Sequence, residues 1–576
     1  MSRARATAAL ALALFVPLHA QSAEEPLPDE HPVGAEVPIT GPEAEEAALR
    51  RRAAEVPDDA TLVAAGAEFG EITIHVRDVF DVSKPEENHW PFRLVNKLHL
   101  RTRGDVVRQL LLFRTGDRYD PELIAESERL LRDTRYLYDA WIRLTRWDGR
   151  RADIEVTTRD VWTLSFGLGF GRSGGESTTR IGIEDSNFLG LGKEITLQRT
   201  DDPDRTESLY RYRDPNLAGS RAQLELSYSD NSDGRYEEVG LARPFFALDA
   251  PWASGALWWD SDREDTLWDA GEEIDRFRHR EEWSEGWAGF SRGIVGRRVL
   301  RWSAGFVRES DQFDVVAGLP PPDVLPADRT VAYPWLGIEV LPARFVTGRN
   351  LNQLVRTEDL RLGLAVTGRL GLSSTAFGAS SDDLVWNAKL NRTWTPSAGR
   401  AMVVVDAATS GRWGDDGREN AVLGGAVHYY VRNLTRHVFY ALLDATVASR
   451  LDAENQLLLG GDNGLRGYPL RYESGDRRVL ATIEQRLYTN WHLLQLVRVG
   501  AAAFLDVGRA WYGDPASAPP GTAAEHPWLA DVGVGLRFGS SRSSRGGMLH
   551  LDVAWALNAP PGVDTLQVNF GAKEQF

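Results

Sequence analysis

The 576-residue sequence contains no cysteine, and it has no long apolar run. The absence of cysteine excludes disulfide bonds, Cys-based zinc sites and thiol nucleophiles. A membrane-spanning helix needs about 18 apolar residues in a row, which no stretch provides, so a membrane protein with this sequence would have to be a β-barrel. Basic residues are outnumbered, 66 Lys and Arg against 83 Asp and Glu, which gives a net charge of -17. This charge argues against a general nucleic-acid-binding protein, because such a protein needs a basic face for phosphates.

Aromatic residues and glycine are abundant by contrast. The chain has 19 Trp, 15 Tyr, 21 Phe and 54 Gly, while its apolar content is an ordinary 42%. Many aromatics and glycines at ordinary hydropathy are typical of an all-β protein with aromatic belts.

The N-terminus has the pattern of an exported protein. An arginine-containing head precedes a short apolar run, Ala8–Val16, and small residues follow it. This pattern predicts a secretory signal peptide over residues 1–23. Residues 24–66 are rich in Pro, Ala and Glu and cannot build a core, so they predict a disordered linker with a short helix around Glu43–Ala54.

Residues 67–158 have the pattern of a small α+β domain. An alternating β-branched stretch, EITIHVRDVF, is followed by two segments with helical spacing. The second of these begins at Asp120, a plausible N-cap, with Pro121 at the first helical position. Two further strands are joined at the turn Asp148-Gly149. The order β-α-α-β-β resembles the polypeptide-transport-associated (POTRA) domain, a periplasmic module; any other small α+β domain is the alternative.

Residues 159–576 consist of alternating segments of about ten residues separated by Gly, Asp, Asn and Pro turns. In VWTLSFGLGFG, for example, Leu164, Phe166 and Leu168 share one face, and Gly167 and Gly169 share the other. This repeated pattern predicts a transmembrane antiparallel β-barrel, giving a mainly β fold. The number of segments is near twenty.

One long loop of the predicted barrel carries a compact group of unusual residues. The loop, Gly461–Asp476, contains Leu465-Arg466-Gly467-Tyr468. On the strands that follow, Glu484 and Asp506 fall on the face opposite the apolar one and so point into the lumen. Two inward carboxylates on neighbouring strands favour a cation between them, and the guanidinium fork of Arg466 matches carboxylates.

These motifs resemble those of the bacterial surface antigen superfamily, the BamA/TamA/FhaC-type outer-membrane assembly and translocation proteins. Leu465–Tyr468 looks like the (V/I/L)RG(F/Y) loop motif of that family, and Phe504–Gly508 looks like its FxDxG strand motif. Glu484 matches its acidic wall residue, Asp185–Gly192 its DNFLGxG segment, and the terminal Phe576 its insertion signal.

The resemblance implies a function without bond chemistry. In this family the loop folds into the barrel, its Arg docks on the wall acids, and incoming β-strands pair at a weak seam between the first and last strands. Gly167, Gly169 and Gly171 lie in the predicted first strand, where glycine lowers strand stability; lining of a crowded lumen or strand curvature would explain them equally. The family also implies sixteen strands, fewer than the segments indicate, and its assembly proteins carry several POTRA copies where this chain shows one.

The partners expected from the resemblance are outer-membrane lipids, unfolded polypeptide clients and periplasmic or accessory assembly proteins, with the POTRA-like domain in the periplasm of a bacterium. No nucleic acid is expected. The alternative function is a passive outer-membrane diffusion pore that carries a periplasmic domain.

No enzyme, cofactor or metal site is predicted. Gly289–Gly293 matches the GxSxG nucleophile pattern around Ser291, but no helix follows it. Gly169–Gly174 fits GxGxxG and is followed by a strand rather than a helix. The acidic run Asp260–Asp265 is interpreted as a solvated loop tip, and the sequence contains no evident His/Asp metal-binding pattern.

Overall fold

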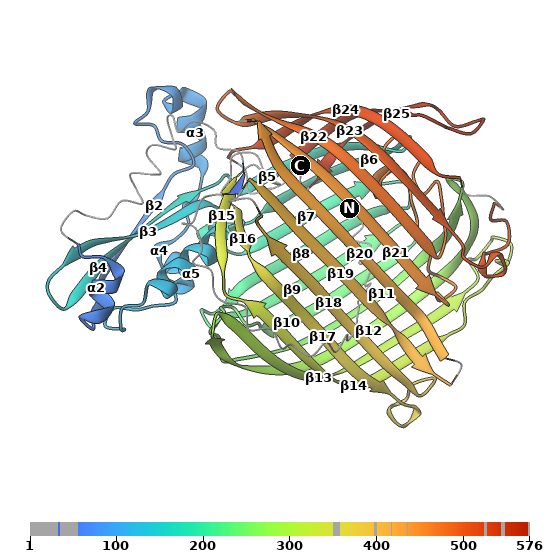
Figure 1. Cartoon of the computed structure of the whole chain (residues 1–576), viewed down its shortest axis with the longest axis horizontal. Coiled ribbons are helices and arrows are strands. Elements are labelled where there is room, and N and C mark those ends of the chain that lie inside the picture. The colour runs from blue at the N-terminus through green and yellow to red at the C-terminus, as the bar shows by residue number, and fades with distance from the viewer. Residues whose placement is uncertain are drawn as a thin grey trace.

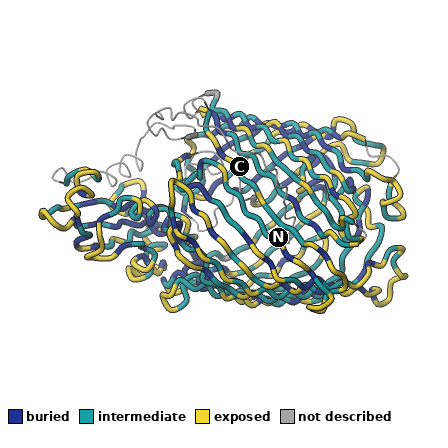
Figure 2. Tube along the Cα trace, turned by 60° about the horizontal axis from the view of Figure 1, so that its bottom comes forward, coloured by how far each residue is buried: buried dark blue, intermediate teal, exposed yellow. Residues whose placement is uncertain are grey.

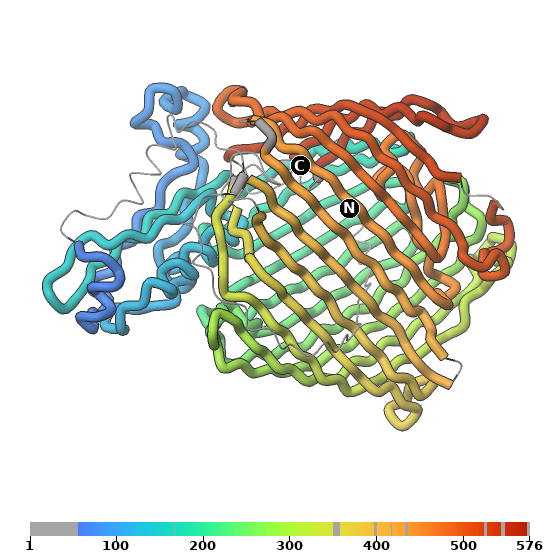
Figure 3. The backbone as a smooth tube through the Cα atoms, in the orientation of Figure 1, coloured from blue at the N-terminus to red at the C-terminus, as the bar shows by residue number. Residues whose placement is uncertain are grey.

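The computed structural model describes residues 33–34, 56–349, 358–396, 400–415, 417–434, 436–523, 527–542 and 548–573. The predicted signal peptide, most of the predicted linker with its helix, and Phe576 lie outside these residues. None of the described helices has the length and hydropathy needed to cross a membrane. The chain forms a closed β-barrel with an α+β unit at one end (Figures 1 and 3).

The N-terminal α+β unit is a three-stranded sheet with helices packed on it. Its sheet order is β2-β4-β3, with β2 parallel to β4 and β3 antiparallel to it. The elements are α2 (Asp59–Ala64), β2 (Glu68–Arg77), η1 (Pro85–Glu87), α3 (Trp90–Leu98), α4 (Gly104–Leu110), α5 (Pro121–Arg132), β3 (Leu137–Trp147) and β4 (Arg151–Asp160). Asp120 caps α5 by accepting a hydrogen bond from the Glu122 backbone N–H, as its sequence position predicts. Helices α2 and α3 were not predicted. Helix α2 lies within residues 24–66, which were expected to be disordered, and α3 buries none of its residues and therefore leaves no buried stripe in the sequence.

The barrel contains 20 antiparallel strands, as the number of alternating segments indicated. The sixteen strands implied by the family resemblance are wrong for this chain, because the segments Glu282–Gly293, Val299–Glu309 and 384–432 all enter the wall. Its strands are β5 (Leu164–Ser173), β6 (Glu176–Asp185), β7 (Glu194–Asp201), β8 (Thr206–Leu217), β9 (Ala222–Asn231), β10 (Gly234–Arg243), β11 (Trp252–Asp269), β12 (Glu272–Val295), β13 (Arg298–Asp314), β14 (Arg329–Pro342), β17 (Gly363–Ser373), β18 (Asp383–Trp394), β19 (Ala401–Gly414), β20 (Gly417–Leu434), β21 (His437–Ser449), β22 (Arg477–Leu493), β23 (Val497–Trp511), β24 (Leu529–Ser540), β25 (Met548–Ala556) and β26 (Leu566–Lys573).

Alternation along the strands separates an apolar outer face from a polar inner one. Leu168, Leu336 and Ile483 are among the large apolar side chains that the wall exposes outward. Thr482 and Glu484, on either side of Ile483 in the chain, are buried on the inner face. Figure 2 shows buried and exposed positions distributed along the same strands. An apolar outer band with polar inward residues is the pattern of a barrel that lies in a lipid bilayer.

A small separate sheet lies between β14 and β17 in the chain. It pairs β15 (Phe345–Arg349) with β16 (Glu358–Arg361), and β1 (Val33–Gly34) adds parallel to β15. The Arg132 guanidinium of α5 binds Asp359 of β16 through two hydrogen bonds, at 2.8 and 2.9 Å. This pair attaches the α+β unit to the barrel at the end where the unit sits (Figure 1).

Candidate functional site

The loop between β21 and β22, residues 450–476, folds into the barrel instead of extending away from it. Leu465 and Tyr468 are fully buried, and they pack with Leu459 and Leu480 in one apolar cluster. Leu465 adopts a positive φ of 57°, which turns the chain sharply before Arg466. The loop is therefore packed against the inside of the wall.

Arg466 lies against two strands of the wall. Its Nε and Nη2 donate to the two carboxylate oxygens of Asp506 at 2.8 and 3.0 Å, and its Nη1 donates to Glu484 at 3.1 Å. The guanidinium carbon lies 3.3 Å from the centroid of the Phe504 ring. The three charged side chains retain 11%, 4% and 2% of their exposure for Arg466, Glu484 and Asp506. The structure thus brings Arg466 of the loop motif together with three of the wall residues that the sequence analysis names, Glu484, Phe504 and Asp506.

The residues that follow Arg466 fix the tip of the loop. The Gly467 backbone N–H donates to Asp531 on β24 at 3.0 Å. A Cβ atom on Gly467 would lie 2.6 Å from the Asp531 Cβ, so only glycine fits here without a shift. The Tyr468 hydroxyl donates to the Ala530 carbonyl oxygen at 3.1 Å and lies 2.8 Å from Asn558 Oδ1. Gly508, on the strand motif, would place a Cβ 2.9 Å from Leu459 of the loop.

Sequence reasoning did not assign a role to two further wall acids, Asp531 and Asp552. Asp552 lies 3.9 Å from Arg466 and also pairs with Arg537. Both acids lie at inward positions of strands in which apolar and polar residues alternate, which is the same signal that identified Asp506. A single-sequence reading places them on the inner face but cannot tell which inward acids lie at the height of the loop tip.

Two ionisable residues of the loop, Arg466 and Glu473, differ in how burial and their neighbours shift their pKa values. Burial disfavours the charged form of Arg466, but attraction to Asp506 and the hydrogen bonds outweigh it and raise the pKa of Arg466 above its ordinary value. Burial raises the pKa of Glu473 to about 8, and the hydrogen bond from the Ala510 N–H offsets this only in part. Arg466 is therefore a permanent cation, whereas the carboxyl group of Glu473 is neutral at neutral pH.

A second set of ion pairs holds the first limb of the loop. Arg329 on β14 binds Glu454 at 2.7 Å and Asp452 at 3.3 Å. Arg412 on β19 also binds Asp452, at 2.6 Å. Further along, Arg471 pairs with Asp204 in the β7–β8 turn. The loop is thus fastened at several points around the inside of the barrel.

The closure between the last and first strands is much sparser than any other contact of the wall. Among the described residues, β26 and β5 share one register pair, Phe570 with Arg172. The next sparsest neighbours, β14 and β17, are paired continuously from Trp335–Gly371 to Val340–Val366. All three predicted seam glycines lie in β5, and the Cβ position of Gly171 is 3.4 Å from the Phe570 carbonyl oxygen.

One side chain of β26 connects the loop to both sides of this closure. Asn569 donates through Nδ2 to the Arg466 carbonyl oxygen at 2.7 Å. Its Oδ1 accepts from the Gly174 N–H, in the turn after β5, at 3.1 Å. Gly174 in turn accepts from the Leu470 N–H of the loop at 3.3 Å. Side-chain and loop contacts thus reinforce the closure where few strand hydrogen bonds are made.

The early motif Asp185–Gly192 lies at the other end of the barrel, against the α+β unit. The Asn187 side chain donates to Thr102 Oγ1 at 2.8 Å and accepts from the Gly192 N–H at 2.6 Å. The Arg103 N–H donates to the Gly190 carbonyl oxygen at 3.0 Å. This segment connects the β6–β7 loop to the α+β unit.

Ser291 lies within strand β12, with β13 next in the chain and no helix between them. Its hydroxyl donates to the Leu300 carbonyl oxygen at 3.0 Å and accepts from the Gly293 N–H at 3.0 Å. The hydroxyl is used in backbone hydrogen bonds, and the strand-to-helix turn of a nucleophile elbow is not formed here. Gly169–Gly174 is likewise a strand and turn.

Comparison with known proteins finds one family match, in the C-terminal part of the barrel. Residues 409–576 match the Omp85 superfamily domain. No curated protein matches the chain. Among solved structures, CdiB from Escherichia coli is 15% identical with a TM-score of 0.44, and 98% of this chain and 93% of that chain are covered. CdiB from Acinetobacter baumannii is 11% identical (TM-score 0.43; 88% and 74% covered), and BamA from Haemophilus ducreyi lacking POTRA domains 1-3 is 13% identical (TM-score 0.39; 87% and 84% covered).

The matched residues run from β19 to the end of the chain and contain the inward loop, Glu484 and Asp506. The resemblance to BamA-type proteins that these motifs indicated is thus confirmed at the level of the superfamily: this barrel carries an Omp85 superfamily domain at residues 409–576.

Proposed function

We propose that this protein resides in the bacterial outer membrane and inserts or translocates unfolded polypeptides through the β5–β26 seam. The observation that carries the proposal is the single register pair between these two strands. Their edges leave backbone N–H and C=O groups for pairing, and an incoming extended chain can add to such an edge as a further strand.

The inward loop supports this function rather than a passive pore. It is held by Arg466 on one part of the wall and by Arg329 and Arg412 on another. A loop packed at this many points across the barrel opposes free diffusion of solutes. We infer that the LRGY tip, with Glu484 and Asp506, keeps the barrel closed and the seam aligned until a client strand pairs at β5.

We infer that the α+β unit acts as a single POTRA-like domain on the periplasmic side, and that residues 67–158 form this domain. The α+β topology of the unit and its attachment next to the β6–β7 loop support this placement. Such a unit would guide a client, or an accessory protein, toward the seam.

Covalent closure of the seam tests the proposal. The chain has no cysteine, so an Arg172→Cys/Phe570→Cys pair provides its only thiols. A photo-crosslinker at Leu168, which is 86% exposed on β5, would report clients that pair there. We expect adducts with nascent outer-membrane proteins in the reduced protein, their loss on oxidation, and their return on reduction.

A matched disulfide between Val553→Cys and Val568→Cys joins β25 to β26 and leaves the seam free. Adducts should persist with this pair. Equal adduct formation with the seam oxidised and reduced would refute entry through the seam. A steady wide conductance from the wild-type protein in planar bilayers, with no client adducts, would support the passive pore instead.

A further inference from the structure

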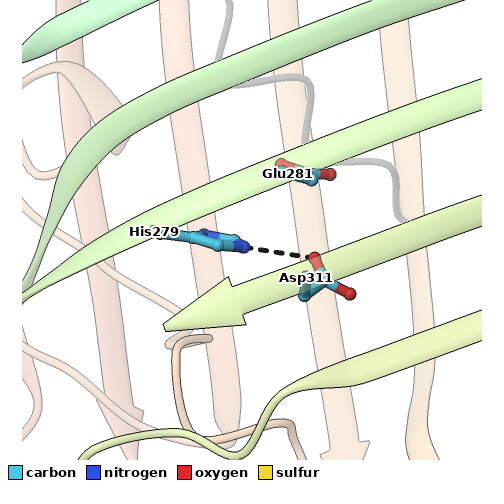
Figure 4. Close-up of side chains that lie close together, drawn as sticks. All are labelled: His279, Glu281 and Asp311. Atoms are coloured by element: carbon cyan, nitrogen blue, oxygen red, sulfur yellow. Dashed lines mark hydrogen bonds and ion pairs between the residues drawn. The ribbon is translucent and has the colours of Figure 1, made fainter. Parts of the chain in front are cut away.

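Away from the loop tip, a histidine and two carboxylates meet on the inner face of β12 and β13. His279 and Glu281 alternate on β12, and Asp311 on β13 is the cross-strand neighbour of Glu281. Each residue offers one ligand atom, and these atoms lie within 4.8 Å of one another. Figure 4 shows the His279 ring directed toward Asp311, with Glu281 beside them. His279 and Asp311 are 3% and 2% exposed, so water competes little with a ligand at this site.

The His279 ring is oriented as in metal sites. Its Nδ1 lies 2.7 Å from Asp265 and 3.1 Å from Arg263 Nη2, and its Nε2 lies 3.1 Å from Asp311 Oδ1. When Nδ1–H donates to Asp265, the lone pair of Nε2 faces the carboxylate oxygen of Asp311. Two acceptors at this distance need a cation between them, which is a proton or a metal ion. A histidine whose far nitrogen is held by a carboxylate is the common arrangement of metal-binding histidines.

Arginines hold the outer oxygens of both carboxylates. Arg263 donates to Glu281 Oε2 at 3.0 Å, and Arg329 donates to Asp311 Oδ2 at 2.9 Å. Each carboxylate therefore keeps one oxygen that is not engaged by an arginine. The arginines orient the ligands in the way that outer partners do in known metal sites.

The charged residues around the site carry a net negative charge that a divalent cation would neutralise. Ion pairs of 3.3 Å or less connect the site to a set of carboxylates that outnumbers its guanidinium groups. The carboxylates are Asp265, Glu281, Asp311, Asp452 and Glu454, and the guanidinium groups are those of Arg263, Arg329 and Arg412. Five negative and three positive charges leave two negative charges when His279 is neutral, and burial makes uncompensated charge costly.

We propose that His279, Glu281 and Asp311 bind one divalent transition-metal cation of the Zn²⁺ class. One imidazole and two carboxylates suit such an ion, whereas Ca²⁺ and Mg²⁺ prefer oxygen ligands alone. With bonds of about 2.0–2.2 Å, tetrahedral ligands lie about 3.4 Å apart, so the widest pair must close by about 1.4 Å. Three protein ligands leave one position for water. The site does not depend on the function proposed above.

Cobalt titration of the full-length protein in detergent tests the site, because Co²⁺ bound by such ligands absorbs visible light. After dialysis against a chelator, we expect the wild type to take up one Co²⁺ per chain, with the absorption bands lost when Zn²⁺ is added. His279→Asn should abolish the bands. Asp265→Asn, which alters only the orienting residue, should weaken binding about 10–100-fold.

His428 provides the matched control, since among the described residues only one carboxylate, that of Asp406 at 3.9 Å, lies within 4 Å of the nitrogens of this barrel histidine. His428→Asn should leave cobalt binding unchanged. Folding of every variant is checked by the electrophoretic mobility of unheated samples, and Glu281→Gln replaces His279→Asn if the latter does not fold. No cobalt uptake by the wild type would show that a proton closes the His279–Asp311 pair and would overturn the proposal, as would unchanged binding in either ligand variant.

Discussion

Removal of the Arg466 side chain is the most direct test of the loop anchor. In Arg466→Ala, the acids Glu484 and Asp506 lose a partner that makes three hydrogen bonds to them. Both acids are almost fully buried, so they cannot recover solvation by turning outward. Breaking a buried pair on one side costs about 3–5 kcal/mol, and we expect this loss in the free energy of unfolding at pH 7.

The pH dependence of that loss gives a second, sharper expectation. A carboxylate without its partner can take up a proton, which costs about 1.4 kcal/mol for each pH unit above its ordinary pKa of about 3.9. This route costs about 4 kcal/mol at pH 7 and about 1.5 kcal/mol at pH 5. The penalty of Arg466→Ala should therefore be about 2.5 kcal/mol smaller at pH 5.

Urea unfolding in detergent micelles, followed by the fluorescence of the 19 tryptophans, measures both effects. Arg471→Ala is the control, because its pair with Asp204 has side chains that are 20% and 29% exposed and should contribute at most about 1 kcal/mol. Adding Asp506→Asn to Arg466→Ala should restore part of the stability. A loss no larger than that of Arg471→Ala would refute the view that the loop is held by a buried ion pair.

Three further changes probe other contacts by the same unfolding measurement. Gly467→Ala places a methyl group 2.6 Å from the Asp531 Cβ and should cost about 1–3 kcal/mol. Burial raises the pKa of Glu473 to about 8 from an ordinary value of 4.5, so its contribution to stability falls as pH rises from about 4.5 to 8. Glu473→Gln should remove this slope, which is up to about 1.4 kcal/mol per pH unit. Arg132→Ala should leave Asp359 without its arginine partner and loosen the α+β unit, which the contacts at Asn187 and Gly190 still hold; modestly faster proteolysis between the unit and the barrel would show this.

Two of these changes have a control variant, and the third has an outcome that would contradict it. Gly571→Ala has no atom within 4 Å of the added methyl group and should be close to neutral. Arg150→Ala, at an exposed pair with Glu68, should not change proteolysis. An unchanged pH slope in Glu473→Gln would mean that another group, or an ionised Glu473, accounts for the pH dependence.

The sequence determined the barrel and the loop anchor for different physical reasons. Alternation has a period of two residues, so Glu484 alone identifies the inner face of β22, and Asp506 that of β23. The anchor itself rested on motifs whose order matched a family. Strand number followed the segments of this chain rather than the family, because each alternating segment must pair to satisfy its backbone groups in a bilayer.

Contacts between distant segments could not be predicted. His279, Glu281 and Asp311 come from two strands, and Asp265 belongs to a run that looks like a solvated tip in sequence. Their proximity depends on strand register, which a single sequence does not state. The contacts of Asn569 and Arg329 with the loop could not be predicted for the same reason.

The carboxamide of Asn569 binds both the loop backbone and the turn after the first strand. Opening of the barrel at the β5–β26 closure and release of the loop therefore break the same hydrogen bonds and are energetically coupled. By thermodynamic reciprocity, a client that spreads the barrel must weaken loop docking by the same free energy with which loop docking resists the client. An antibody or small molecule that binds the loop only in its docked state should therefore inhibit polypeptide entry without contacting the β5–β26 closure.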